Sequence, residues 1–239
     1  MIYDDVIRDI LLLPCVESAA ELALSGLADA DIWPMCDGPQ MILRHDMAYE
    51  LGGGTLPAIG LTAVTTDEGL VPEDGLYLCG PDLRDIDRDT QFARAALIRV
   101  KKDTVSEGQR FYRLIKDLDH TKYHFYPEGF MLRISSYERR ECVRVSREAV
   151  KNGISLAGMG ELMINAFRKN RAVEAVRLIY ITAPDAKLSG LAALSRKAEA
   201  ITDTIDHIGT MAVTDCDACG LKNICDEVEG LRELHFGTV

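Results

Sequence analysis

Three cysteines near the C-terminus have the residue type and spacing of metal ligands. Cys216 and Cys219 form a C-x2-C pair, and Cys225 follows after one short loop. A C-x2-C pair places two thiolates on one tight turn, as zinc sites and iron–sulfur clusters require. Two inert thiols with one buried cysteine, or a disulfide, are the competing interpretations. The spacing favours a metal or cluster site.

The spacing does not distinguish iron from zinc. A [4Fe–4S] cluster on three protein thiolates leaves one iron in need of a further ligand. The candidates are Cys36, His235, a small molecule or a residue of another protein. A structural zinc ion would use the same three cysteines together with His235.

Five arginines gather about a predicted β-hairpin in a chain that is acidic overall. Guanidinium groups suit phosphates because they donate paired hydrogen bonds. The alternative is a solvated charged hairpin whose arginines pair with Glu138, Glu141 and Glu148. The five residues are Arg133, Arg139, Arg140, Arg144 and Arg147.

Two further patterns carry weaker signals. The run Gly52-Gly53-Gly54 would let the backbone approach a phosphate, although a plain turn is the commoner use of such a run. His120 and His124 would share one face of a helix as a metal pair. Pro127 and the aromatic residues around them predict a loop or strand instead, so we interpret these histidines as packing residues.

Composition bounds the class of protein. The chain has 239 residues, of which 47% are hydrophobic, enough for a large core. Its net charge of −11 argues against a nucleic-acid partner, which would need a basic stripe. Seven cysteines, an odd number, predict a reducing cytoplasm rather than a secreted disulfide framework. The acidic N-terminus is unlike a signal peptide, and no apolar run is long enough to cross a membrane.

Hydrophobic periodicity predicts the elements that must position these residues. The predicted strands lie at 41–51, 61–65, 76–79, 95–100, 129–135, 141–146 and 173–182. The predicted helices lie at 2–13, 18–26, 106–118, 146–153, 162–167 and 186–208. This mixture predicts an α+β (mixed α/β) fold, a mixed sheet with packed helices. We divide it into an N-terminal helical pair (1–40), an α+β domain (41–210) and a Cys-rich C-terminal tail (211–239).

Several segments occur in the order of a known family. They are Glu50-Leu-Gly-Gly53, Leu76-Tyr-Leu-Cys-Gly-Pro-Asp-Leu83, Val143-Arg-Val-Ser-Arg147 and the cysteines. In these the chain resembles the acetyl-CoA synthase component of the carbon monoxide dehydrogenase/acetyl-CoA synthase complex, called its beta subunit in archaea. The resemblance covers roughly residues 49–225, and the first forty or so residues have no obvious match.

The resemblance implies a cofactor, partners and an activity. In that family the C-x2-C and a following cysteine bind the cubane of a nickel–iron–sulfur cluster, and these match Cys216, Cys219 and Cys225. Coenzyme A binding by the middle domain implies a role for the hairpin arginines. The implied activity is acetyl-CoA synthesis from carbon monoxide, a methyl group and coenzyme A. The implied partners are carbon monoxide dehydrogenase or a corrinoid protein.

The chain also departs from the family pattern. The loop before Cys225 is shorter than in the family, and residues 226–239 hold no further cysteine. The family's nickel-binding Cys-Gly-Cys is absent. We therefore expect no catalytic residue for the nickel chemistry here. The chain is predicted to be a stand-alone iron–sulfur accessory protein of anaerobic one-carbon or corrinoid metabolism, with a non-catalytic zinc-bearing interaction module as the alternative.

Overall fold

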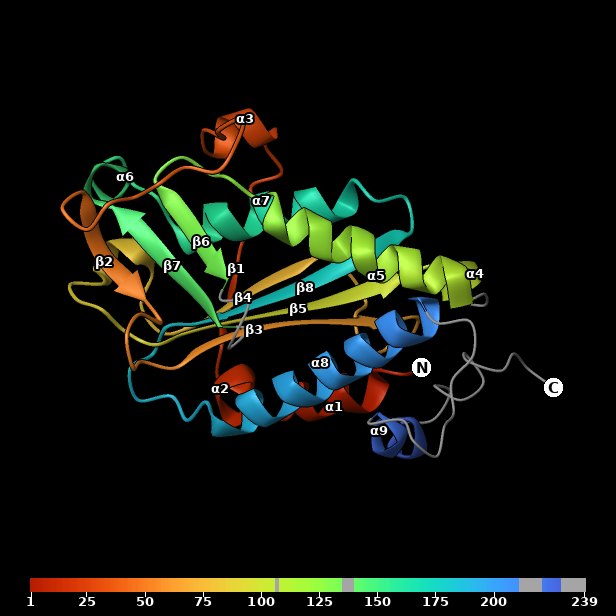
Figure 1. Cartoon of the computed structure of the whole chain (residues 1–239). Coiled ribbons are helices and arrows are strands. Elements are labelled where there is room, and N and C mark those ends of the chain that lie inside the picture. Colours follow the sequence, from red (N-terminus) through yellow and green to blue (C-terminus); the bar gives the residue numbers. More distant parts are fainter. Residues whose placement is uncertain (106–107, 135–139, 211–220, 229–239) are drawn as a thin grey trace.

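Two β-sheets organise the computed structural model (Figure 1). The structure describes residues 1–239 apart from 106–107, 135–139, 211–220 and 229–239. The strands are β1 (Ala20–Leu22), β2 (Met47–Leu51), β3 (Ala58–Thr65), β4 (Gly75–Cys79), β5 (Phe92–Val100), β6 (Phe130–Ile134), β7 (Glu141–Ser146) and β8 (Val173–Ile181). The helices are α1 (Asp4–Leu11), α2 (Pro14–Glu17), α3 (Asp29–Ile32), α4 (Lys102–Val105), α5 (Gly108–Tyr123), α6 (Arg147–Lys151), α7 (Leu156–Arg168), α8 (Ser189–Thr210) and α9 (Lys222–Glu227), with the 3-10 turn η1 at Leu83–Asp85.

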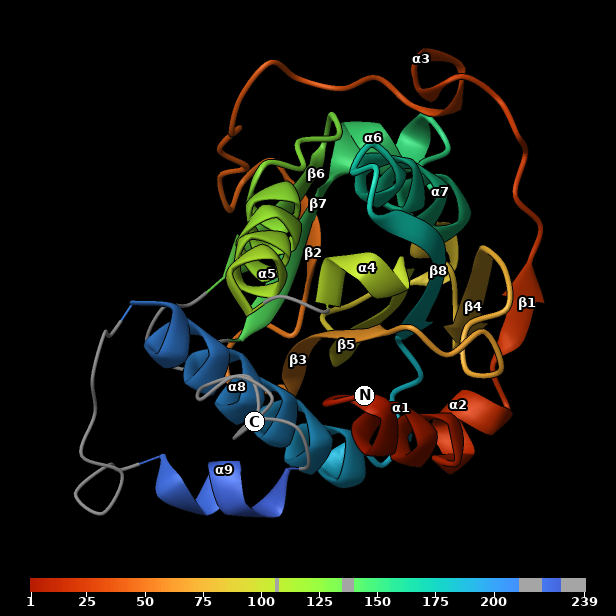
Figure 2. The same ribbon diagram turned by 90° about the vertical axis from the view of Figure 1, so that its right-hand side faces the viewer.

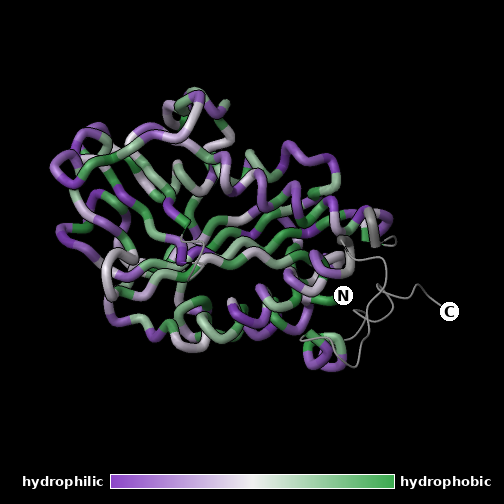
Figure 3. Tube along the Cα trace, in the orientation of Figure 1, coloured by the Kyte–Doolittle hydropathy of each residue, from purple (hydrophilic) through white to green (hydrophobic). Residues whose placement is uncertain are grey.

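The larger sheet is mixed, which confirms the predicted α+β class. Its strand order is β1-β4-β8-β5-β3, with β4–β8 and β5–β3 parallel and the other two pairs antiparallel. β5 and β8 lie at its centre and are almost entirely buried. Both strands are predominantly apolar because helices cover both faces of the sheet. Figure 3 shows the hydrophobic residues concentrated along these central strands.

The smaller sheet is antiparallel, in the order β2-β7-β6. The predicted hairpin is confirmed as β6 and β7, with Phe130 opposite Val145 and Ile134 opposite Glu141. Ser146 caps α6 through a 3.1 Å hydrogen bond from the Ala149 amide, as the sequence predicted.

Helices cover the larger sheet from two sides (Figure 2). α7 packs on β8 and β4 and contacts α5, whereas α1 and α8 pack together beneath β3. α5 buries Phe111, Leu114, Ile115 and Leu118, as its periodicity predicted. In the described part of the chain, no helix is both long enough and apolar enough to span a membrane.

Two local predictions were wrong. Residues 18–26 do not form a helix: α2 ends at Glu17, and Ala20–Leu22 pair with β4 as an edge strand. A short helix is marginal alone, so ladder hydrogen bonds to β4 outweigh local helix propensity. α5 also continues through His120, where a loop or strand was predicted. The His120 and His124 rings stack with centroids 3.7 Å apart.

Candidate functional site

A buried ion pair joins the two sheets. Arg94 on β5 donates two hydrogen bonds of 2.8 Å each to the two carboxylate oxygens of Glu141 on β7, and the side chains are 1% and 2% exposed. Gly60 on β3 lies opposite Arg94 in the sheet register. A Cβ atom at Gly60 would lie 1.9 Å from the Glu141 Cδ atom, so only glycine leaves room for this carboxylate. The glycine and the arginine within apolar strands were sequence signals for this contact.

Lys122 on α5 extends the pair into a network. Its Nζ atom lies 3.4 Å from an Asp119 oxygen and 3.6 Å from a Glu141 oxygen. Burial alone would raise the pKa of the Glu141 carboxyl, but the charges of Arg94 and Lys122 outweigh burial and hold this pKa below its ordinary value. Glu141 is therefore an ionised carboxylate with two cationic neighbours.

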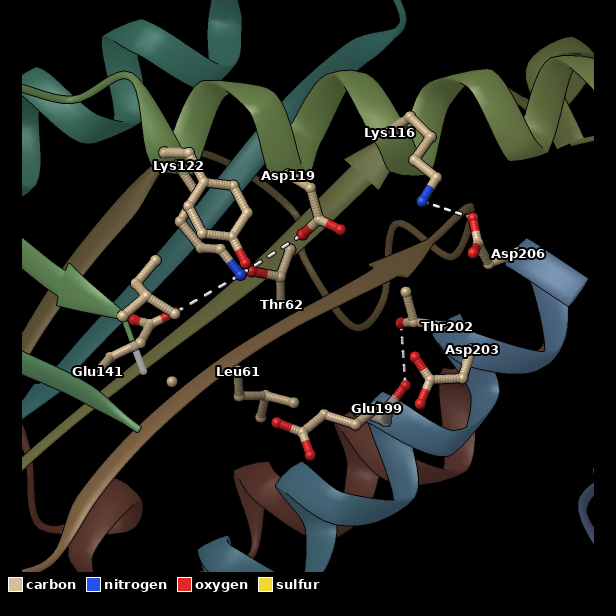
Figure 4. Close-up of a pocket in the computed structure, with 14 residues that line it drawn as sticks. Leu61, Thr62, Lys116, Asp119, Lys122, Glu141, Glu199, Thr202, Asp203 and Asp206 are labelled. Atoms are coloured by element: carbon tan, nitrogen blue, oxygen red, sulfur yellow. Dashed lines mark hydrogen bonds and ion pairs between the residues drawn. The ribbon is translucent and has the colours of Figure 1, made fainter. Parts of the chain in front are cut away.

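Glu141 and Lys122 line a cleft of about 360 Å³ between α5, α8 and β3, hereafter the α5–α8 cleft (Figure 4). Lys122 points between Glu141 and Asp119, with Thr62 beside it. At the other end, Lys116 on α5 forms an ion pair with Asp206 on α8. The remaining polar lining comes from one face of α8 and from α5: Glu199, Thr202, Asp203 and Tyr123.

The lining of the α5–α8 cleft determines what it can hold. Five carboxylates line it against two lysines, and the acidic members are Asp119, Glu141, Glu199, Asp203 and Asp206. This balance disfavours an anionic ligand such as a phosphate. Its ammonium and carboxylate groups could orient a small polar molecule by hydrogen bonds, although both lysines already form ion pairs with carboxylates of the lining.

The described members of the predicted arginine cluster lie outside the α5–α8 cleft, around β2 and the glycine run. Arg140 donates hydrogen bonds of 2.8 Å to the Gly52 and Gly54 carbonyls and a further bond to the Leu56 carbonyl. Gly52 has a φ of +70°, and a Cβ there would lie 2.6 Å from that of Ala58. The glycine run is thus a tight turn tied to the hairpin.

Glu50 is the carboxylate that pairs with the hairpin arginines, and sequence reasoning missed it. Its Oε1 atom accepts hydrogen bonds from Arg133 at 2.7 Å and from Arg144 at 2.8 Å. Burial would raise the pKa of Glu50, but these two guanidinium groups lower it below its ordinary value. Arg147 is exposed and donates to the His45 carbonyl at 3.0 Å. Arg139 and Glu138 lie outside the described residues.

The segment Leu76–Leu83 is also a structural junction. Gly80 has a φ of +118°, and a Cβ there would lie 2.2 Å from the Ala183 backbone nitrogen. The Asp82 carboxylate accepts 2.6 Å hydrogen bonds from the Leu83 and Leu156 amides, which ties β4 to the start of α7. Tyr49 in turn donates to the Leu83 carbonyl. These contacts join β2, β4 and α7.

The predicted thiol site lies mostly beyond the described residues. Cys216 and Cys219 fall in 211–220, and His235 falls in 229–239. Cys225 is half-buried on α9, which packs on α8 and is held there by a 2.8 Å ion pair between Lys197 and Glu227. Cys36 is half-buried in the connector before β2, and its amide donates to the Tyr126 carbonyl at 2.8 Å. Within the described ranges, no three His, Cys, Asp or Glu side chains are grouped to hold a metal ion.

The fold and its junctions define a two-sheet α+β protein in which α9, the helix that bears Cys225, packs on α8. The family model for the CO dehydrogenase/acetyl-CoA synthase complex beta subunit matches residues 29–187. The chain belongs to this family. The match begins earlier than the resemblance suggested and ends before α8 and the three cysteines. No curated protein matches the chain.

Proposed function

We propose that this chain is an accessory member of the family that carries an iron–sulfur cluster but no nickel site. Family membership over residues 29–187 supports a role beside the CO dehydrogenase/acetyl-CoA synthase complex. The sequence contains no Cys-Gly-Cys, the motif that the resemblance assigns to nickel. We expect the chain to act in anaerobic one-carbon or corrinoid metabolism rather than to make acetyl-CoA itself. A cytoplasmic location, inferred from cysteine usage, stays a prediction.

The anchored position of Cys225 is the observation that carries the proposal. α9 is held on α8, which makes the segment around the third thiol part of the folded chain. Three cysteine thiols are a donor set that suits both an iron–sulfur cluster and zinc. Cys216, Cys219 and Cys225 would hold the cluster, and a bound cluster supplies one-electron transfer. Zinc on the same cysteines, in a non-catalytic interaction module, is the alternative.

A protein partner is part of the proposal. The family is described as the beta subunit of a complex, the CO dehydrogenase/acetyl-CoA synthase complex. We propose carbon monoxide dehydrogenase or a corrinoid protein as the partner, because both handle the one-carbon groups that the resemblance implies. An acidic chain favours a partner with a basic surface.

Anaerobic reconstitution with iron and sulfide tests the cluster. We expect wild type to become brown and retain both elements, Cys219→Ser to lose most of them, and the matched control Cys15→Ser to behave like wild type. Zinc in place of iron, lost in Cys219→Ser, would establish the alternative. Equally little metal in wild type and Cys219→Ser would refute both.

A second experiment tests the accessory role. An anaerobic assay with nickel, a methylated corrinoid protein, carbon monoxide and coenzyme A should give no acetyl-CoA. Turnover that depends on Cys216 and Cys219 would contradict the accessory role.

Coenzyme A binding by the hairpin arginines stays a prediction. Arg133, Arg140 and Arg144 are engaged with Glu50 or with loop carbonyls, so a phosphate would have to compete for them. Arg147→Ala is the variant least expected to disturb the fold, because this side chain is exposed. Calorimetric titration of wild type with coenzyme A tests the prediction, and the absence of binding heat would end it.

A further inference from the structure

The connector that leads from α3 to β2 can be followed in Figure 2. Its residues line a second hollow together with residues next to β6 and on α6. The connector is held to the segment before β6 by a 2.8 Å hydrogen bond from the Glu128 amide to the Pro34 carbonyl, and the Trp33 indole donates to the Glu128 carbonyl at 2.7 Å. The hollow has a volume of about 320 Å³. We call it the Trp33 groove. Its lining includes Trp33, Met41, Ile42, Asp46, Glu128 and Glu148.

The charged lining of the Trp33 groove is acidic throughout. Asp46, Glu128 and Glu148 contribute carboxylates, and none of the lining residues is a lysine or arginine. Asp46 lies 3.3 Å from the ring of His45. Glu128 and Glu148 are exposed, and no cationic group among the described residues forms an ion pair with either. The groove therefore presents negative charge that the described part of the fold does not neutralise.

Apolar residues also line the Trp33 groove, and exposed hydrophobic residues lie along the connector that forms it. Met41 is 74% exposed, and the connector also presents Met35 at 44% and Leu43 at 47%. These are three of the six large hydrophobic residues exposed in the described part of the chain. Methionine and aromatic residues are enriched in protein interfaces, and methionine adapts its shape to a partner.

We propose that the Trp33 groove docks a protein partner that inserts a lysine or arginine side chain and covers the exposed methionines with apolar residues. The aliphatic stem would pack on Trp33 and Met41 while its charged end meets Glu128 and Glu148. The tryptophan face adds a favourable cation–π contact. The same carboxylates repel a nucleic acid or an anionic lipid surface. The proposal rests on the proposed function only for the existence of a protein partner, whose surface chemistry it specifies.

Trp33 is the only tryptophan in the sequence, so its fluorescence reports directly on the groove. The probe is a synthetic peptide of alternating leucine and lysine, compared with peptides in which glutamate replaces lysine or serine replaces leucine. We expect a saturable change in Trp33 fluorescence with the leucine–lysine peptide, weaker binding of the serine–lysine peptide and none of the leucine–glutamate peptide.

Two double variants separate the groove from general attraction to an acidic chain. Glu128→Gln/Glu148→Gln should weaken peptide binding about tenfold, equivalent to about 1.4 kcal/mol. Glu21→Gln/Glu73→Gln changes the net charge equally at exposed sites outside the groove lining and should leave binding unchanged. Met41→Ser should also weaken binding, because it removes apolar contact.

Three outcomes would overturn the proposal. Equal weakening by both double variants would mean non-specific charge attraction. A peptide that leaves Trp33 fluorescence unchanged would mean that the groove is not the site. A concentration-dependent Trp33 signal without peptide, lost in Met41→Ser, would identify a second copy of this chain as the occupant. The titration needs no metal, so failure of the groove and failure of the cluster site are distinguishable.

Discussion

The α5–α8 cleft and the Trp33 groove are similar in volume but differ in whether cations accompany the carboxylates of their lining. In the α5–α8 cleft, Glu141 is paired with Arg94 and flanked by Lys122, and Lys116 pairs with Asp206. In the Trp33 groove, Glu128 and Glu148 share the lining with apolar residues, and the lining residues include no lysine or arginine. The first hollow pairs several of its carboxylates with cations of the fold, whereas the lining of the second contains no lysine or arginine.

The difference separates charge that holds the fold from charge that is available to a partner. A charge taken out of water needs a partner in the same chain, because the cost of desolvation is otherwise too large. An exposed carboxylate has no such need, since water solvates it. We therefore expect substitutions in the α5–α8 cleft to change stability and those in the Trp33 groove to change binding.

Removal of Arg94 should have the largest effect. Arg94→Met leaves the Glu141 carboxylate buried beside Lys122 alone, and breaking such a pair typically costs about 3–5 kcal/mol. Urea unfolding measures the loss. Lys116→Met breaks the exposed pair with Asp206 and should cost about 1 kcal/mol or less. Similar losses in the two variants would contradict the distinction between buried and exposed pairs.

Gly60→Ala should be the next most damaging change. The added Cβ would overlap the Glu141 carboxylate, and overpacking of this kind typically costs about 1–3 kcal/mol. Gly158→Ala is the matched control in α7, where the nearest atom to a new Cβ lies 3.4 Å away. That variant should gain up to about 1 kcal/mol from helix propensity. A stable Gly60→Ala variant that keeps the Arg94–Glu141 pair would show that the strand can shift.

Much of the fold could be predicted from the sequence because its signals are local. β8, the β6–β7 hairpin and α8 follow from hydrophobic periodicity, and Ser146 at the start of α6 follows from capping chemistry. β1 could not be predicted in this way, because three residues become a strand only through pairing with β4. Local patterns thus identify elements that carry their own signal and miss those that a neighbour imposes.

The candidate site was harder to predict because its partners are distant in sequence. Arg94 and Glu141 are 47 residues apart, and Arg144 and Glu50 are 94 apart. The hairpin arginines were identified, but their carboxylate partner was sought among nearby glutamates rather than on β2. The number of arginines and carboxylates in the sequence does not show which of them pair, because the register between strands determines which side chains meet.

Acid should weaken the Arg94–Glu141 pair reversibly. The pKa of Glu141 is lowered in the folded state, so its contribution to stability is complete above the ordinary glutamate pKa of about 4.3 and is lost as pH falls below it. Urea unfolding of wild type and Glu141→Gln at a series of pH values measures this contribution. The stability difference between the two should shrink as pH falls below about 4.3. A difference independent of pH would mean that the Glu141 charge does not contribute.

The carboxylates of the Trp33 groove should matter least to folding. Glu148 lies in the first turn of α6, where a negative charge is favourable by a few tenths of a kcal/mol, and Glu128 is itself exposed just before β6. Glu128→Gln/Glu148→Gln should therefore change the free energy of unfolding by about 0.5 kcal/mol or less. Urea unfolding beside the Glu21→Gln/Glu73→Gln control measures this. A loss of several kcal/mol would show that these carboxylates hold the fold, and the groove would then no longer differ from the α5–α8 cleft. A small loss combined with weakened peptide binding would assign their charge to a partner, because selection for folding alone would not require it.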